Sequence, residues 1–163
     1  MKIKLLLFFA LSVFICHSQN VSYSNIKKVV LETYPDIDMT NKLLAISIWN
    51  SQDVLSREDN KEFKRTCFVY EGAKLKGGLK GVVFISISSD VIKSNADIAI
   101  TKDGLLENYV ICDYKAFDST GKLNKMGLNS SIKNIVFDTH GNQLFENIDN
   151  QQIFKSFNNL ITR

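Results

Sequence analysis

Two short apolar runs are the strongest feature of the hydrophobic pattern. Residues 43–49 (LLAISIW) and 82–88 (VVFISIS) have the length of strands and are almost entirely apolar. Strands that are covered on both faces have this composition, which is typical of parallel sheets. The charged segment between them, 54–70, places Phe63 and Cys67 on one helical face. Together the three segments predict a β-α-β unit, in which a helix connects two parallel strands.

The pattern before the first apolar run predicts a helix. Ser24 has the side chain of a helix N-cap, and Ile26, Val29 and Val30 follow at helical spacing. Pro35, the only proline in the chain, ends this segment because its ring is incompatible with a continuing helix.

The C-terminal part predicts a β-hairpin and then a helix. Residues 134–138 and 143–146 flank the turn THGN, which contains the glycine that hairpin turns often need. Asn150 is expected to cap an amphipathic helix after the hairpin. The apolar stripe of this helix consists of Ile153, Phe154, Phe157, Leu160 and Ile161.

The middle of the chain has a weaker pattern. Residues 92–106 are expected to be helical in part, 109–113 to form a short strand, and 119–126 to form a short helix that ends at Gly127. The complete order places parallel strands first and an antiparallel hairpin late. This order predicts an α/β fold, a three-layer sandwich in which a mixed central sheet has helices on both faces.

The first eighteen residues have the pattern of a cleaved signal peptide. Two lysines lie within residues 1–4, an apolar run follows at 5–15, and small residues precede the expected cleavage after Ser18. The apolar run is shorter than the about 20 residues that a transmembrane helix needs. A lipoprotein anchor on Cys16 is the alternative, which the bulky Ile15 in front of it disfavours.

Composition narrows the classes of partner and cofactor. Cleavage lowers the formal net charge from +3 to +1, and such a surface gives no electrostatic reason to expect nucleic acid or an anionic membrane as a partner. No other stretch is apolar enough to span a membrane, and residues 19–163 have the length of one domain. After cleavage, the only cysteines and histidine of the sequence are Cys67, Cys112 and His140, and their spacing is not that of metal ligands. We therefore expect no metal and no other cofactor.

The segment ISIWNSQDVLSRED, residues 46–59, resembles part of a known family. In thioredoxin-like proteins, and in particular the secreted thiol-disulfide and peroxiredoxin-related proteins of bacterial envelopes, a strand ends in an aromatic residue and a loop leads through Cys-x-x-Cys into a helix. Trp49 matches the aromatic residue, while Asp53 and Ser56 occupy the two cysteine positions. The later segment IVFDTHG, residues 135–141, resembles the strand and turn of the same family. The resemblance implies a thioredoxin-like fold over nearly the whole mature chain.

A second departure from the family concerns a proline. The family usually has a cis proline just before the first strand of the hairpin, facing the redox loop. Ile132 or its neighbour occupies that position here, in the segment SSIKN. Because cis peptide bonds are rare before residues other than proline, we expect a trans bond and an altered backbone edge at this place.

Asp53 is expected to cap the helix that follows the loop. Its carboxylate can accept hydrogen bonds from free backbone N–H groups, which stabilises a helix by about 0.5–2 kcal/mol. Arg57, four residues later, is expected to pair with Asp53. Ser56 lacks the base and orienting group that a nucleophilic serine needs. A catalytic carboxylate pair among Asp53, Glu58 and Asp59 stays open, although acidic residues are common at helix starts.

Cys67 and Cys112 are the remaining thiol pair. An exported protein can keep a disulfide, but both cysteines lie in apolar patterns, where a free cysteine behaves as a small hydrophobe. Buried thiols are therefore favoured over a bridge. The alternative function is a divergent thiol-disulfide oxidoreductase or peroxiredoxin-like enzyme that uses one or both cysteines.

The chain resembles the thioredoxin-like family but has no cysteine at the two motif positions. This combination favours a redox-inactive domain that acts by binding an envelope protein or a small ligand. The expected compartment is the periplasm. Attachment to the outer membrane through a lipid on Cys16 is the less favoured alternative. A structural subunit of an envelope complex is a third interpretation. Trp49 either contacts the ligand or closes the end of the core. The candidate binding surface consists of Trp49, Asn50, Gln52, Asp53, Ser56 and Ile132.

Overall fold

The structure is a computed structural model that describes residues 21–105, 109–116, 118–129 and 131–161. The expected signal peptide and Cys16 therefore lie outside the described residues. Among the described residues, no helix has the length and apolar composition to cross a membrane.

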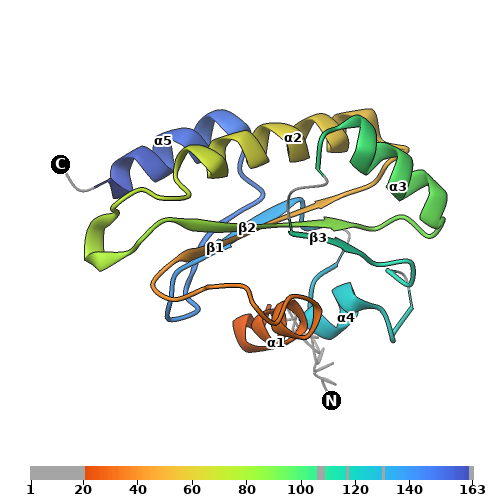
Figure 1. Ribbon diagram of the computed structural model, residues 1–163, viewed down its shortest axis with the longest axis horizontal. Helices are drawn as coiled ribbons and strands as arrows, with labels where there is room; N and C mark the ends of the chain where they lie inside the picture. Colours follow the sequence, from red (N-terminus) through yellow and green to blue (C-terminus); the bar gives the residue numbers. More distant parts are fainter. Residues whose placement is uncertain (1–20, 106–108, 117, 130, 162–163) are drawn as a thin grey trace, which may run out of the picture.

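A five-stranded mixed sheet forms the centre of the molecule, with the strand order β3-β2-β1-β4-β5 (Figure 1). Strand β1 pairs in parallel with β2 and antiparallel with β4, so the chain reverses direction within the sheet. The other two pairs are parallel β2–β3 and antiparallel β4–β5. The strands are β1 (Leu43–Trp49), β2 (Val82–Ser88), β3 (Tyr109–Cys112), β4 (Asn134–Phe137) and β5 (Gln143–Glu146). The two central strands have the bounds that the apolar runs predict.

Helices cover both faces of this sheet. In Figure 1, α1 and α4 lie below the sheet and α2, α3 and α5 lie above it. The helices are α1 (Tyr23–Thr33), α2 (Val54–Val69), α3 (Lys93–Lys102), α4 (Lys122–Met126) and α5 (Asn150–Leu160), with a short 3-10 turn η1 (Lys76–Gly78) before β2. The predicted three-layer α/β sandwich is confirmed.

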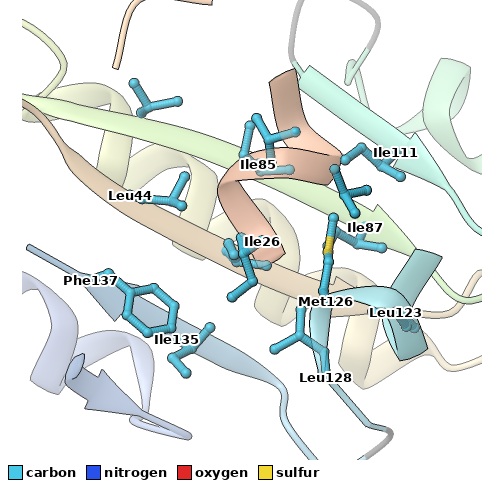
Figure 2. Packing of buried hydrophobic residues seen from close by; sticks show 14 of the residues in the cluster. Ile26, Leu44, Ile85, Ile87, Ile111, Leu123, Met126, Leu128, Ile135 and Phe137 are labelled. Atoms are coloured by element: carbon cyan, nitrogen blue, oxygen red, sulfur yellow. The ribbon is translucent and has the colours of Figure 1, made fainter. Parts of the chain in front are cut away.

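The two layers of helices explain why β1 is apolar on both faces. Leu44 and Ile46 belong to the core that packs against α1 and α4. Leu43 and Ala45 belong to the core that packs against α2 and α5. Alternate residues of a strand point to opposite faces, and here both faces are covered. Figure 2 shows the first core, in which Ile26 and other apolar side chains gather between the helices and the sheet.

Two predicted helix caps are wrong by one or two residues. The N-cap of α1 is Ser22, whose Oγ accepts a hydrogen bond from the Asn25 backbone N at 3.4 Å, and Ser24 lies inside the first turn. The N-cap of α5 is Asp149, whose carboxylate accepts from the Gln152 backbone N at 2.8 Å. In each helix the cap side chain accepts a hydrogen bond from the backbone N–H three residues later. Several neighbouring polar residues have side chains that could serve as the N-cap, so the sequence alone does not choose between them.

The predicted helix 119–126 also begins later, at Lys122. Asp118 accepts a hydrogen bond from the Thr120 backbone N at 2.9 Å, and this local turn precedes the helix. Gly127 closes α4 with φ of 73°, a left-handed conformation that glycine adopts without the steric cost of a side chain. The described residues contain no cis peptide bond, and the bond before Ile132 is therefore trans, as the missing proline predicts.

Candidate functional site

A cavity of about 510 Å³ opens at the end of β1, between the start of α2 and the segment that leads from α4 into β4. Five of the six residues of the candidate binding surface line it, namely Trp49, Asn50, Asp53, Ser56 and Ile132. The sixth, Gln52, is not in the lining, and its side-chain amide donates to Ser51 Oγ at 3.1 Å. We call this space the Asp53 cavity.

Asp53 caps α2 as predicted. Its Oδ1 accepts a hydrogen bond from the Ser56 backbone N at 3.1 Å. The Ser56 hydroxyl in turn accepts from the Asn50 backbone N at 3.1 Å, and Asn50 Oδ1 accepts from the Gln52 backbone N at 3.0 Å. The side chains of the loop are therefore used to hold its own backbone. This arrangement fixes the rim of the cavity and leaves Ser56 positioned as a structural residue of the turn.

The predicted pairing of Arg57 with Asp53 is wrong. The Arg57 guanidinium makes two hydrogen bonds to the Asp103 carboxylate, Nε to Oδ2 at 2.9 Å and Nη2 to Oδ1 at 2.5 Å. This contact raises the pKa of Arg57 above its ordinary value. A two-pronged contact between planar groups is stronger than an exposed pair along one helix, so the distant partner prevails. It ties the first turns of α2 to the C-cap of α3.

A second long-range contact at this end of the sheet joins Asp90 to Ser51, and the sequence did not predict it. The buried carboxylate of Asp90 accepts hydrogen bonds from the backbone N of Ser51 at 3.1 Å and from its Oγ at 2.6 Å. It also accepts from Ser88 Oγ at 2.6 Å. The loops that follow β1 and β2 are thereby joined. The polar triplet Ser88-Ser89-Asp90 directly after an apolar strand was the signal that could have indicated this.

Trp49 closes the end of the core. Its side chain is 1% exposed and packs against Ala96 and Ala99 of α3. The indole Nε1 donates to Ser86 Oγ at 2.7 Å, and that hydroxyl donates to Asn60 Oδ1 at 3.1 Å. The core interpretation of Trp49 is therefore confirmed, although the residue also contributes to the lining of the Asp53 cavity.

Both remaining cysteines are free thiols, so the alternative of a Cys67–Cys112 disulfide is wrong. Cys67 is buried among apolar side chains of α2 and the sheet, and this burial raises the pKa of its thiol far above its ordinary value. Cys112 is half-buried beside α3, and burial raises the pKa of its thiol as well. Neither cysteine lines the Asp53 cavity.

Metal ligands do not gather in the part of the chain that the structure describes. No group of three or more histidine, cysteine or acidic side chains there is arranged to hold a metal ion. His140 lies in the β4–β5 turn, where its backbone N donates to Asp138 Oδ1 at 2.9 Å.

No protein-family model and no curated protein matches the chain. Solved structures do. The thioredoxin domain of a thiol-disulfide oxidoreductase from Bacteroides vulgatus has 13% identity and a TM-score of 0.58, covering 75% of this chain and 81% of that one. A thioredoxin-like protein from Parabacteroides distasonis has 13% identity and a TM-score of 0.59, covering 74% and 83%. A thiol-disulfide oxidoreductase from Bacteroides fragilis has 22% identity and a TM-score of 0.57, covering 73% and 81%.

These similarities concern the path of the backbone, since the identities are low while the matched parts extend over most of each chain. They agree with the five-stranded mixed sheet and its two layers of helices. The chain therefore has a thioredoxin-like fold, as the segments around Trp49 and Asp138 predict.

Proposed function

We propose that the chain is a redox-inactive thioredoxin-like domain that acts by binding a protein or a small ligand in the Asp53 cavity. One observation carries this proposal. Asp53 and Ser56 occupy the positions where the resemblance calls for cysteines, and the Asp53 carboxylate caps α2 at 3.1 Å from the Ser56 backbone N. A helix start favours negative charge, and here an oxygen anion meets that preference instead of a thiolate.

The composition of the Asp53 cavity supports binding. Its volume of about 510 Å³ falls in the range of roughly 300–1,000 Å³ that small-molecule sites have. Leu123, Leu128 and Ile132 provide apolar surface, while Asn50 and Asn129 provide amide groups. The lining also includes the charged residues Asp53, Asp59 and Lys133, so polar and apolar groups contribute about equally to the walls. Sites that bind an organic ligand or a short peptide segment combine apolar surface with polar groups that fix its orientation.

The remaining thiols do not favour the enzyme alternative. Thiol-disulfide exchange requires a thiolate that a second sulfur can reach. Burial raises the thiol pKa of Cys67 and of Cys112, which keeps both groups protonated near neutral pH. The activity named for the Bacteroides structures belongs to those proteins, and this chain replaces the cysteine pair that the resemblance associates with it.

A disulfide-reduction assay tests the redox part of the proposal. The protein and its Cys67→Ser/Cys112→Ser variant are compared in the reduction of insulin disulfides by dithiothreitol. We expect equal rates, both at the uncatalysed level. A rate for the unaltered protein well above that of the double variant would establish the enzyme alternative instead.

A pair of variants tests the binding part. Asn124 lies on the exposed surface of α4 and lines the Asp53 cavity, whereas Lys125, also exposed, does not line it. Asn124→Trp is expected to fill the cavity from its rim and to abolish binding of ligands found by a thermal-shift screen of envelope metabolites and peptides. Lys125→Trp adds the same side chain one residue away and is expected to leave binding unchanged. Equal binding by both variants would locate the ligand elsewhere.

The export of the chain belongs to the same proposal. Its support is the basic, apolar and small-residue pattern of residues 1–18. Cleavage after Ser18 predicts a mature protein in the periplasm that begins at Gln19. Mass spectrometry of the protein from a fractionated bacterial host distinguishes this outcome from a lipid-modified N-terminus at Cys16 in the membrane fraction.

A further inference from the structure

The inner wall of the Asp53 cavity contains a buried hydroxyl group that has no partner in the fold. Ser47 of β1 lines this cavity and is only 3% exposed. Its Oγ makes no hydrogen bond within the residues that the structure describes. Burying a polar group without a hydrogen bond costs free energy, and such groups are rare in folded proteins. Ser47 is therefore a group that a ligand in the cavity can satisfy.

The neighbouring strand shows how the fold uses a serine at this depth. Ser86 of β2 is the register partner of Ser47 and is also buried. Its Oγ accepts a hydrogen bond from Trp49 Nε1 at 2.7 Å and donates to Asn60 Oδ1 at 3.1 Å. Two serines at the same level of the sheet thus differ in one respect. The hydroxyl of Ser86 joins two other side chains, whereas that of Ser47 faces the cavity lining without a bond.

A second unpaired donor lies behind this wall. Asn60 of α2 is 1% exposed, and its Nδ2 has no hydrogen-bond partner in the described parts of the chain. The orientation of the amide follows from Ser86, whose hydroxyl already accepts from Trp49 and therefore offers its own hydrogen to Asn60 Oδ1. Asn60 is not in the cavity lining, but Phe63, three residues later on the same face of α2, is. Only a thin layer of side chains thus separates the amide from the cavity.

These two groups select the chemistry of a ligand. An amide N–H can only donate, and a serine hydroxyl can donate as well. A carbonyl oxygen accepts two hydrogen bonds and brings no hydrogen that needs an acceptor, whereas an ammonium group cannot bond to an N–H donor. The charged residues of the lining are Asp53, Asp59 and Lys133, two acids against one base. This balance disfavours a carboxylate relative to an uncharged group.

We propose that the inner wall of the Asp53 cavity is a subsite for an uncharged carbonyl group of the ligand, with Ser47 Oγ as the first donor and Asn60 Nδ2 as the second. This inference rests on the binding role proposed for the cavity and names the chemistry that the ligand offers there. The two buried groups gain their hydrogen bonds only in the complex, so the free protein carries a cost that binding removes. A small molecule and a peptide backbone can both supply such a carbonyl.

A nuclear magnetic resonance titration tests the subsite. The probe is N-methylpyrrolidone, a five-membered ring with one carbonyl and no N–H group, and N-methylpyrrolidinium is the matched ring without the carbonyl. With the first probe only, we expect saturable shifts of the Ser47 and Phe63 backbone amide signals and of the Asn60 side-chain NH₂ signals. Equal shifts with both probes, or no saturable shift with N-methylpyrrolidone, would overturn the proposal. Unmoved Asn60 side-chain signals beside shifted Ser47 signals would remove Asn60 from the subsite.

Two serine variants separate a ligand contact from a structural role. Ser47→Ala removes a hydroxyl that no described side chain uses, so Tm is expected to stay unchanged or rise, while the dissociation constant of N-methylpyrrolidone rises about two- to tenfold. Ser86→Ala is the matched control on the register partner. It leaves Trp49 Nε1 and Asn60 Oδ1 unpaired and is expected to lower Tm by about 3–10 °C. An equal fall in Tm for both variants, or an unchanged dissociation constant in Ser47→Ala, would refute the assignment.

The cavity-filling variant Asn124→Trp keeps this test apart from that of the proposed function. If Asn124→Trp abolishes binding of the probe and Ser47→Ala leaves it unchanged, then the cavity binds ligands and the subsite is wrong. If neither variant weakens binding, then the probe binds outside the cavity, which contradicts the subsite and the binding role of the cavity alike.

A capped amino acid identifies the source of the carbonyl. N-acetyl-alanine N′-methylamide represents a peptide backbone. Tighter binding of this compound than of N-methylpyrrolidone, weakened by Ser47→Ala, assigns the carbonyl to a peptide, and weaker binding assigns it to a small molecule.

Discussion

The ion pair between Arg57 and Asp103 gives the most quantitative prediction. Arg57→Met removes the guanidinium but keeps most of the apolar stem of the side chain. The Asp103 side chain, which is only 4% exposed, then loses both hydrogen bonds of this pair at 2.5 and 2.9 Å. Asp103 also lies at the C-cap of α3, where negative charge is unfavourable, so the loss of its cation has a second cost.

The burial of the two partners sets the magnitude. Removing one partner of a fully buried pair costs about 3–5 kcal/mol, whereas exposed pairs contribute about 0.2–1 kcal/mol. The Arg57 side chain is 18% exposed, so solvent screens part of the interaction. We therefore expect Arg57→Met to lower the free energy of unfolding by about 2–3 kcal/mol, which corresponds to a fall in Tm of about 5–10 °C.

Urea unfolding followed by the fluorescence of Trp49, the only tryptophan, measures this effect. Arg65→Met is the matched control, because Arg65 pairs with Glu62 on the same helix with side chains that are 73% and 51% exposed. This control is expected to cost less than about 1 kcal/mol. If Arg57→Met costs no more than Arg65→Met, then the contact with Asp103 does not stabilise the protein and the reasoning from burial is wrong.

Three further predictions concern the cap, the thiols and an exposed carboxylate. Asp53→Ala is expected to lower the free energy of unfolding by about 0.5–2 kcal/mol in urea titrations, and Asp149→Ala, which removes the cap of α5, by a similar amount; no loss in either would contradict the capping geometry. Because burial raises the pKa of both thiols, Cys67 is expected to react with a thiol reagent only after unfolding. Cys112 is expected to react slowly at neutral pH, at a rate that rises toward alkaline pH. Fast labelling of Cys67 in the native protein at pH 7 would refute this. Hydrogen bonds from the Thr40 backbone and from Lys42 lower the pKa of Asp38 to about 2. Its stabilising contribution is therefore present above pH 4 and lost as the pH falls toward 2, so the stability difference between Asp38→Asn and the unaltered protein should narrow over that range in pH-dependent unfolding.

Interactions between near neighbours could be predicted from the sequence. The bounds of β1 and β2 coincide with the apolar runs, because helices cover both faces of these strands and each covered position is therefore apolar or small. The cap of α2 needs only Asp53 and a backbone N–H three residues later, so it is also local information. The caps of α1 and α5 are local too, but adjacent polar residues were equivalent in the sequence, and only the geometry separates Asp149 from its neighbour.

Contacts between distant segments could not be predicted in this way. The partner of Arg57 is 46 residues away, and the partner of Asp90 is 39 residues away. For Arg57, the largely buried carboxylate of Asp103 prevails over an exposed partner on the same helix. For Asp90, the folding of the sheet brings the loop after β1 within hydrogen-bond distance. The burial of Trp49 depends in the same way on α3, which packs over it only in the folded chain.

The amino-acid sequence by itself therefore determined the layers, the strands β1 and β2, and the absence of cysteine from the loop before α2. Each of these depends on residue type and on spacing along the chain. The tertiary structure decided which side chains meet: it brought Asp53 and Ile132 to one cavity, and Arg57 to Asp103. The reason is physical, since the pairing of strands and the packing of helices set distances between segments that no local pattern contains.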